Sequence, residues 1–177
     1  MLESLLTPKS IAVVGASRTP GKVGHEIVAN LIQSGYAGRI YPINPSAKDV
    51  LGLPCIGSLQ EVDGPIDLAV IAVPTPLVLQ TVETALQIGV GALTIITAGF
   101  KEVGESGAQV ERQIAQLCRA RDVRLLGPNC LGLLNTHHAM NASFAKRMPP
   151  KGNISIISQS GALCTAILDW ASQHQMG

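Results

Sequence analysis

The stretch IAVVGASRTPGKVG (residues 11–24) joins an apolar run to a glycine-rich turn. Its first four residues are apolar and mostly β-branched, which is typical of a strand buried on both faces. A helical pattern follows at 22–34, and Gly35 marks its end. The apolar residues that carry this pattern are Val23, Ile27, Val28, Leu31 and Ile32. We therefore expect the fold to open with a strand, a glycine turn and a helix.

Apolar runs and helical patterns continue to alternate along the chain. A loop with a short turn is predicted at 51–62. Further strands are predicted at 39–45, 67–74, 92–97 and 123–129, and further helices at 75–89 and 105–121. This order is typical of a parallel sheet covered by helices on both faces. Residues 1–128 are thus predicted to form a doubly wound, Rossmann-like α/β domain.

A second region begins after this domain. Residues 129–152 show no clear period and are interpreted as a linker. Residues 153–177 then predict one strand, a Ser/Gly turn and one helix. One strand and one helix cannot bury their own apolar faces. We interpret them as the start of a second, truncated α/β domain of flavodoxin-like type.

The composition argues against several classes of protein. The 13 basic and 12 acidic residues nearly balance, and aromatic residues make up 3% of the chain, so a nucleic-acid binder is not expected. No apolar run approaches the roughly 20 residues of a membrane span, and the first residues do not resemble a signal peptide. The cysteines, Cys55, Cys118, Cys130 and Cys164, form no CxxC pair. We predict reduced thiols in a cytoplasmic protein without a metal site.

The glycine turn is a candidate phosphate site. Its spacing is G-x5-G-x2-G over Gly15, Gly21 and Gly24, which is longer than the dinucleotide pattern GxGxxG. A helix that starts at such a turn offers free N–H groups to an anion. The side chains that could assist are Ser17, Arg18, Thr19 and Lys22. The alternative is a tight turn whose cations are merely solvated.

The end of the second strand distinguishes between ligands. An NAD site needs an acidic residue there for the ribose, but Asn44 is followed by no acid until Asp49. Lys48 lies nearby instead and fits a phosphorylated ribose, as in NADP or coenzyme A. The turns at 72–76, 97–100 and 127–132 complete a rim along which an extended ligand could lie.

Seven ordered segments carry a resemblance to a known family. They are LLTPKSIAVVGAS, YPINP, LGLPC, IAVPTP, TAGFKE, LGPNCLGLLN and ISQSGAL. Together they resemble the coenzyme A-binding domain of NDP-forming acyl-CoA synthetases, which include ADP-forming acetate–CoA ligases and the α subunit of succinyl-CoA synthetase. Ala98 and Thr165 stand where the succinyl enzymes carry glutamate and tyrosine, so the resemblance is to the acetate–CoA ligase branch.

The resemblance implies a coenzyme A cradle and a phosphate site. Serine hydroxyls and free N–H groups at the second-domain helix would steady the phosphate of a phosphohistidine. No catalytic residue is assigned in this chain, because none of its four histidines stands where the family has the phosphohistidine. Ser158, Ser160 and Gly161 form the implied phosphate site. The candidate coenzyme A residues are Gly15, Ser17, Arg18, Thr19, Pro20, Gly21, Lys22, Asn44, Lys48, Val73, Pro74, Thr97, Ala98, Gly99, Asn129 and Cys130.

The resemblance also implies an activity and partners. The family joins an acid to coenzyme A while ATP becomes ADP and phosphate, through an acyl phosphate and a phosphohistidine. We expect this chain to be the coenzyme A-binding portion, inactive by itself, with ATP, ADP and Mg²⁺ bound by an ATP-grasp domain or β subunit in cis or trans. Two alternatives stay open: the acyl-CoA-sensing region of a protein lysine acetyltransferase, and a plain NAD(P)-binding domain. Homo-oligomerisation is also left open.

Overall fold

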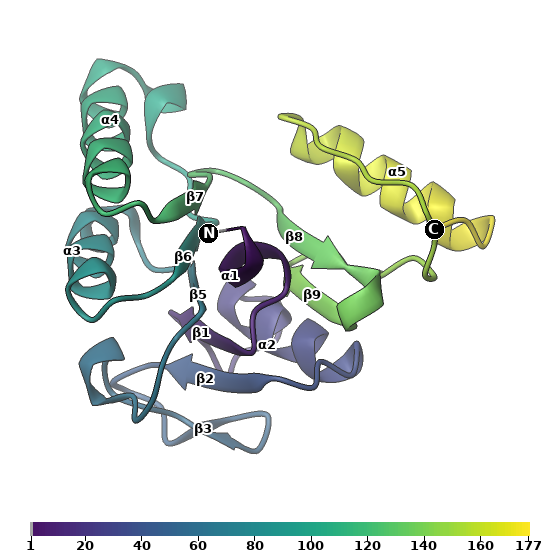
Figure 1. Ribbon diagram of the computed structural model, residues 1–177, viewed down its shortest axis with the longest axis horizontal. Helices are drawn as coiled ribbons and strands as arrows, with labels where there is room; N and C mark the ends of the chain where they lie inside the picture. Colours follow the sequence, from purple (N-terminus) through teal and green to yellow (C-terminus); the bar gives the residue numbers. More distant parts are fainter. Residues whose placement is uncertain (1) are drawn as a thin grey trace.

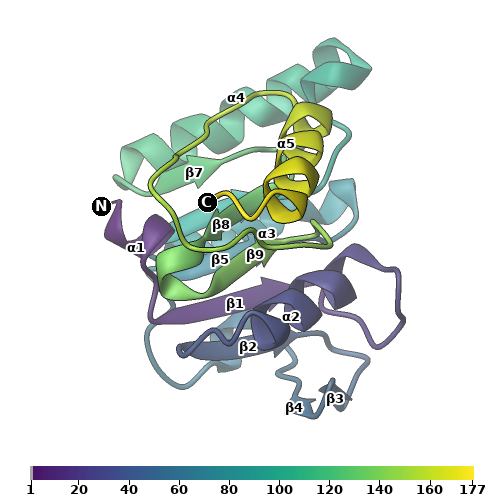
Figure 2. The same cartoon turned by 90° about the vertical axis from the view of Figure 1, so that its right-hand side faces the viewer.

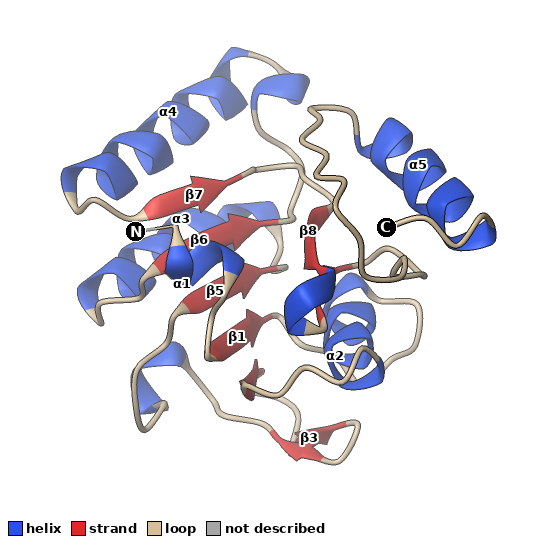
Figure 3. Ribbon diagram, turned by 45° about the vertical axis from the view of Figure 1, so that its right-hand side comes forward, coloured by secondary structure: helices blue, strands red, loops and turns tan. Residues whose placement is uncertain are grey.

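The computed structural model describes residues 2–177, and a five-stranded parallel sheet forms its centre (Figures 1 and 3). The strands lie in the order β2-β1-β5-β6-β7. They span Ser10–Val14 (β1), Arg39–Ile43 (β2), Leu68–Ile71 (β5), Ala92–Ile95 (β6) and Arg124–Leu126 (β7). After β2 the next sheet strand, β5, is added on the other side of β1, so the strand order reverses between β1 and β5, where doubly wound folds bind ligands. The predicted α/β sheet is confirmed.

One face of the sheet is covered by two helices, α3 (Thr75–Gln87) and α4 (Glu105–Ala120) (Figure 1). Their apolar faces pack on alternate residues of the inner strands. Pro76 lies in the first turn of α3, where its missing N–H breaks no helical bond. The buried members of this layer include Val78, Val82, Ile114, Ala69, Leu93 and Phe100. The helices predicted at 75–89 and 105–121 are therefore confirmed.

The other face is covered by α2 (Val23–Gln33) and by a β-hairpin (Figure 2). The hairpin consists of β8 (Gly132–Asn135) and β9 (Met140–Ser143), joined by the 3₁₀ turn η3 (Thr136–His138). Every residue of β9 is buried. The segment interpreted from the sequence as a linker without a clear period, 129–152, contains this hairpin. The two strands have only four residues each, which is too short for a readable period, and their burial comes from contacts distant in sequence.

Smaller elements complete the first 126 residues. A short helix, α1 (Glu3–Leu6), precedes the sheet. The segment predicted as a loop with a short turn at 51–62 contains β4 (Leu53–Pro54), which pairs with β3 (Asp49–Val50) just before it, and the short 3₁₀ turn η1 (Leu59–Glu61). Another 3₁₀ turn, η2 (Lys101–Val103), precedes α4.

The last segment contains the predicted helix but not the predicted strand. Helix α5 spans Gly161–Gln173, whereas residues 153–158 pair with no strand in the described part of the chain. The side chains of Ile154, Ile156 and Ile157 are exposed. A strand needs a neighbour for its backbone hydrogen bonds, and the apolar pattern alone cannot supply one. None of the helices within residues 2–177 has the length and hydrophobicity needed to cross a membrane.

Candidate functional site

The glycine turn after β1 brings three backbone segments into close contact. Gly15 has φ +90°, and a Cβ there would lie 2.5 Å from the carbonyl oxygen of Ala72. A Cβ on Gly24 would collide with the carbonyl oxygen of Gly15. Only glycine therefore lets α2 begin so near the end of β1 and the neighbouring strand β5.

Hydrogen bonds within the turn hold its shape and leave amide groups free. Ser17 Oγ accepts from the Thr19 N–H at 3.1 Å, and Glu26 Oε1 accepts from the Gly21 N–H at 2.8 Å. Within the described chain, the N–H groups of Val23 and Gly24, at the first turn of α2, have no acceptor. Free amides at a helix N-terminus are suited to a phosphate group.

Cations gather beside this turn. Arg18 and Lys22 are exposed on the turn, and Lys48 is exposed where the β3–β4 hairpin begins. Burial raises the pKa of the Cys55 thiol, as does the charge of Asp49, while the Arg18 guanidinium opposes that rise. The Cys55 N–H donates to the Lys48 carbonyl oxygen at 2.9 Å, so the residue that the charge of Arg18 reaches is bonded to the backbone of Lys48.

Asn44 ties the end of β2 to the glycine turn. Its Nδ2 donates to the Ala16 carbonyl oxygen at 2.6 Å, and its Oδ1 accepts from the Ser46 N–H at 2.8 Å. Both side-chain groups are thus used inside the protein. Asn44 therefore shapes the turn, and its predicted contact with coenzyme A stays a prediction.

The ends of β5 and β6 are tied to each other by threonine hydroxyls. Thr97 Oγ1 donates to the Val73 carbonyl oxygen at 2.7 Å, and Thr75 Oγ1 donates to the Ala98 carbonyl oxygen at 2.8 Å. The Gly99 N–H donates to Glu102 Oε1 at 2.6 Å. That hydrogen bond lowers the pKa of the Glu102 carboxyl group. These bonds fix the two turns where the sequence predicts part of the ligand path.

The turn after β7 packs against the end of β6. Asn129 has φ +53°, and its N–H donates to the Thr97 carbonyl oxygen at 3.0 Å. Cys130 Sγ donates to the Ile95 carbonyl oxygen at 3.3 Å. Burial raises the pKa of the Cys130 thiol, which therefore stays protonated at neutral pH. A protonated, hydrogen-bonded thiol is a poor nucleophile, so the structure favours a packing role for Cys130.

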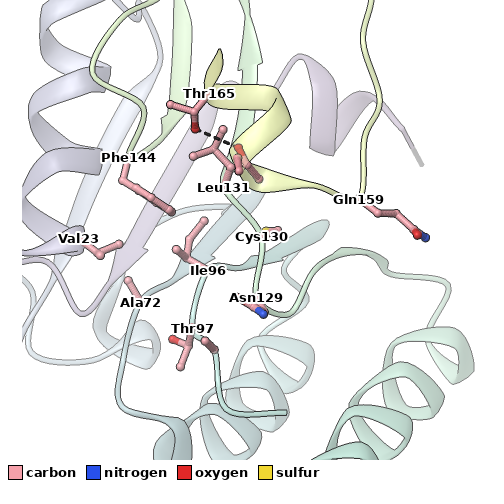
Figure 4. A pocket seen from close by; sticks show the side chains of 13 residues that line it. Val23, Ala72, Ile96, Thr97, Asn129, Cys130, Leu131, Phe144, Gln159 and Thr165 are labelled. Carbon is pink, nitrogen blue, oxygen red and sulfur yellow. Dashed lines mark hydrogen bonds between the residues drawn. The ribbon is translucent and has the colours of Figure 1, made fainter. Parts of the chain in front are cut away.

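These turns surround a cavity of about 620 Å³ (Figure 4). Its size is that of ordinary small-molecule sites. Its lining includes no carboxylate, histidine or cation, and it is closed on one side by the start of α5. Thirteen residues line it: Val23, Ala72, Ile96, Thr97, Ala98, Asn129, Cys130, Leu131, Phe144, Gln159, Gly161, Ala162 and Thr165.

Some of the predicted site residues lie in this cavity and others lie outside it. Thr97, Ala98, Asn129, Cys130 and Gly161 share the lining. The remaining candidates are not among the lining residues: Gly15, Ser17, Arg18, Thr19, Pro20, Gly21, Lys22, Asn44, Lys48, Val73, Pro74, Gly99, Ser158 and Ser160.

The sequence reasoning missed several lining residues. Ala72 and Ile96 come one residue before predicted positions, so a wider window at each strand end finds them. Phe144 had no such signal, because it lies in the segment interpreted as a linker.

The start of α5 combines a serine cap with free amides. Ser160 Oγ accepts from the Leu163 N–H at 3.2 Å, and Ser158 Oγ accepts from the Ser160 N–H at 3.0 Å. The next two residues, Gly161 and Ala162, line the cavity. The helix N-terminus therefore borders the cavity, where its dipole favours an anion.

Histidines and metal ligands give no further site within residues 2–177. No group of three His, Cys, Asp or Glu side chains in that range could hold a metal ion. His25 Nδ1 bonds to the Ser17 carbonyl oxygen at 2.9 Å, and His137 Nε2 bonds to that of Gly152 at 3.0 Å. His174 stacks on Trp170 with 4.5 Å between ring centroids. These imidazoles have structural contacts outside the cavity lining.

Comparison with known proteins identifies relatives over the whole chain. The family model described as "CoA binding domain" matches residues 9–136. The acetate–CoA ligase [ADP-forming] of Methanocaldococcus jannaschii is 47% identical over 176 residues, which are 99% of this chain and 24% of that protein. The acetate–CoA ligase [ADP-forming] II subunit alpha of Pyrococcus furiosus is 41% identical over 177 residues, covering 100% of this chain and 38% of the subunit.

A solved structure shows the same fold. It is the dinucleotide-forming acetyl-coenzyme A synthetase 1 of Candidatus Korarchaeum cryptofilum, in complex with phosphate and ADP. It superimposes with a TM-score of 0.93 and 38% sequence identity, over 100% of this chain and 38% of that one. The chain thus spans between a quarter and two fifths of the length of these relatives.

Proposed function

Because this chain belongs to the family of CoA-binding domains, we propose that it binds coenzyme A and serves as the coenzyme A-binding part of an ADP-forming acid–CoA ligase. The observation that carries the proposal is the cavity at the carboxyl ends of the parallel strands, which runs from the first turn of α2 to the first turn of α5. The relatives are ligases, which favours this function over an acyl-CoA sensor.

The parts of the site match the parts of coenzyme A. The phosphates would lie at the free amides of Val23 and Gly24, beside the cations Arg18 and Lys48. The flexible, uncharged arm, with its amide groups, would run through the uncharged cavity. The thiol would then reach the turn at Asn129 and Cys130, at the far end of the lining. This arrangement needs no ribose-binding carboxylate, in contrast to an NAD site.

Phosphoryl chemistry requires groups that this cavity lacks. We propose that ATP or ADP and Mg²⁺ are bound by an ATP-grasp domain or β subunit, in cis or in trans, and that phosphate meets the start of α5 at Ser158, Ser160 and Gly161. Helix α5 supports such a partner, because none of its residues is buried and Leu163 and Trp170 are each 51% exposed.

The proposal is tested by isothermal titration of the chain with coenzyme A, NAD and NADP in parallel. We expect coenzyme A alone to bind. Arg18→Ala and Lys48→Ala should each weaken binding roughly five- to tenfold, because each removes a charge-assisted contact to phosphate. Arg121→Ala is the matched control, since Arg121 is exposed at the end of α4 outside the candidate site. Binding of NAD or NADP without coenzyme A would contradict the proposal.

A further inference from the structure

One aromatic side chain projects into the cavity from the segment that was interpreted as a linker. Phe144 directly follows β9, and its ring points toward Ile96 (Figure 4). It is the only aromatic residue among the thirteen that line the cavity. The residues before and after it, Ser143 and Ala145, are 0% and 5% exposed, whereas Phe144 is 39% exposed. Both neighbours of Phe144 are therefore buried, while its own side chain lines the cavity.

Buried hydrogen bonds hold the backbone on both sides of Phe144. Asn30 Nδ2 donates to the carbonyl oxygens of Ser143 at 2.8 Å and Ala145 at 2.9 Å. The Ala145 N–H donates to Ser143 Oγ at 3.1 Å, and Ser143 Oγ donates to Asn141 Oδ1 at 2.6 Å. Few rotations remain for the backbone that carries the ring. The backbone thus holds the Cα–Cβ bond of Phe144 at the edge of the cavity that its side chain lines.

The hairpin register relates Phe144 to the turn that carries Cys130. Gly132 pairs with Ser143 in the antiparallel hairpin, so Leu131, just before Gly132, and Phe144, just after Ser143, are the next residues beyond this pair at the open end. Leu131 comes directly after Cys130, at the turn where the thiol of coenzyme A is proposed to lie. Among the other residues that line the cavity, Ala98, Gly161 and Ala162 have small side chains. A bulky ring beside the thiol limits the space for a group attached to it.

We propose that Phe144 limits the size of the acyl group that the cavity accepts on the thiol of coenzyme A. The inference rests on the proposed function, because it takes the coenzyme A thiol to lie at Asn129 and Cys130. It assigns Phe144 as a specificity-determining residue. The ring excludes larger acyl chains by occupying the space that their added methylene groups would need.

The test compares dissociation constants of coenzyme A, acetyl-CoA and butyryl-CoA for the chain and its variants by isothermal titration. The unsubstituted chain should bind acetyl-CoA at least as tightly as butyryl-CoA. In Phe144→Ala, each methylene that becomes buried should gain roughly fourfold in affinity, so butyryl-CoA, with two more methylenes, should bind about fifteenfold more tightly than acetyl-CoA. Phe144→Leu should give an intermediate ratio. Ile88→Ala, a 40% exposed apolar residue at the opposite end of α3, should leave the ratio unchanged.

Each outcome decides between the two proposals. If the unsubstituted chain does not bind coenzyme A, the proposed function fails and the inference fails with it. If coenzyme A binds but the butyryl-to-acetyl ratio of Phe144→Ala equals that of the unsubstituted chain, only the inference is overturned. A uniform weakening of all three ligands would also overturn it, because the ring would then contact the arm rather than the acyl group. Thermal unfolding of each variant verifies that it is folded.

Discussion

Asn30 connects α2 to the end of β9, and its removal should destabilise the whole chain. The side chain is 7% exposed and donates to two carbonyl oxygens, those of Ser143 and Ala145, across 113 and 115 residues of sequence. Asn30→Ala removes both hydrogen bonds. The Ala145 oxygen keeps only a longer bond, 3.3 Å, from Asn141 Nδ2. The Ser143 oxygen loses its side-chain donor.

The magnitude follows from these contacts. Two buried hydrogen bonds at roughly 1–1.5 kcal/mol each give a loss of about 2–3 kcal/mol in the free energy of unfolding. For a chain of this size, that loss corresponds to a fall in Tm of about 4–12 °C. Urea unfolding followed by circular dichroism measures the free energy, and a thermal scan measures Tm. The slope with urea should stay unchanged, since the folded state is otherwise the same.

A matched control separates this contact from the mere loss of an amide on α2. Gln33 lies on the same helix with an exposed side chain, so Gln33→Ala should change the free energy by no more than about 0.5 kcal/mol. If Asn30→Ala were as mild as this control, the hydrogen bonds to the end of β9 would not hold the hairpin on α2. The backbone that carries Phe144 would then not be held in place by Asn30.

Three further predictions concern the turns of the site. Gly24→Ala should lower Tm more than Gly21→Ala, because a Cβ on Gly24 meets the Gly15 carbonyl whereas one on Gly21 meets open space and suffers only from φ +82°; equal shifts in thermal scans would refute this. Cys130 should react with iodoacetamide at pH 8 more slowly than a free thiol, measured by mass spectrometry. Its raised pKa contributes stability that is present below the unfolded pKa and is lost as pH rises through the folded value. The lowered pKa of Glu102 has the opposite effect on the free energy of unfolding. Its stabilising contribution is present above the unfolded pKa and is lost as pH falls through the folded pKa. An NMR titration of Glu102 with a midpoint at or above 4.5 would contradict this prediction.

The parallel sheet was predictable because its signals are local. Each strand is a short, nearly continuous apolar run, and each helix has its own periodicity, so neither needs knowledge of distant residues. The turn at Gly15 was predictable for the same reason, since a glycine between a buried strand and a helix marks the ligand end of this fold. The cavity accordingly includes Thr97, Ala98 and Asn129, which follow predicted strands.

The rest depends on contacts that a local pattern does not record. Residues 132–143 form a hairpin that packs on α2 and the sheet, and the backbone carbonyl oxygen of the buried Ser143 accepts from Asn30 on α2, 113 residues away in sequence. Residues 153–158 have a strong strand pattern but no partner strand among the described residues, so they stay unpaired. Phe144 could not be assigned to the site from the sequence, because only the folded hairpin brings it into the lining of the same cavity as Cys130.

The long span between Asn30 and the end of β9 also sets the order in which the site can form. Helix α2 can dock on β1 while the chain is still being synthesised, since the two are adjacent in sequence. The outer side of α2 then stays in water until about residue 145 has emerged from the ribosome. Closing a loop of more than 100 residues is slow, so the hairpin should be among the last elements to settle. A nascent chain would therefore have a complete sheet before it could hold a ligand.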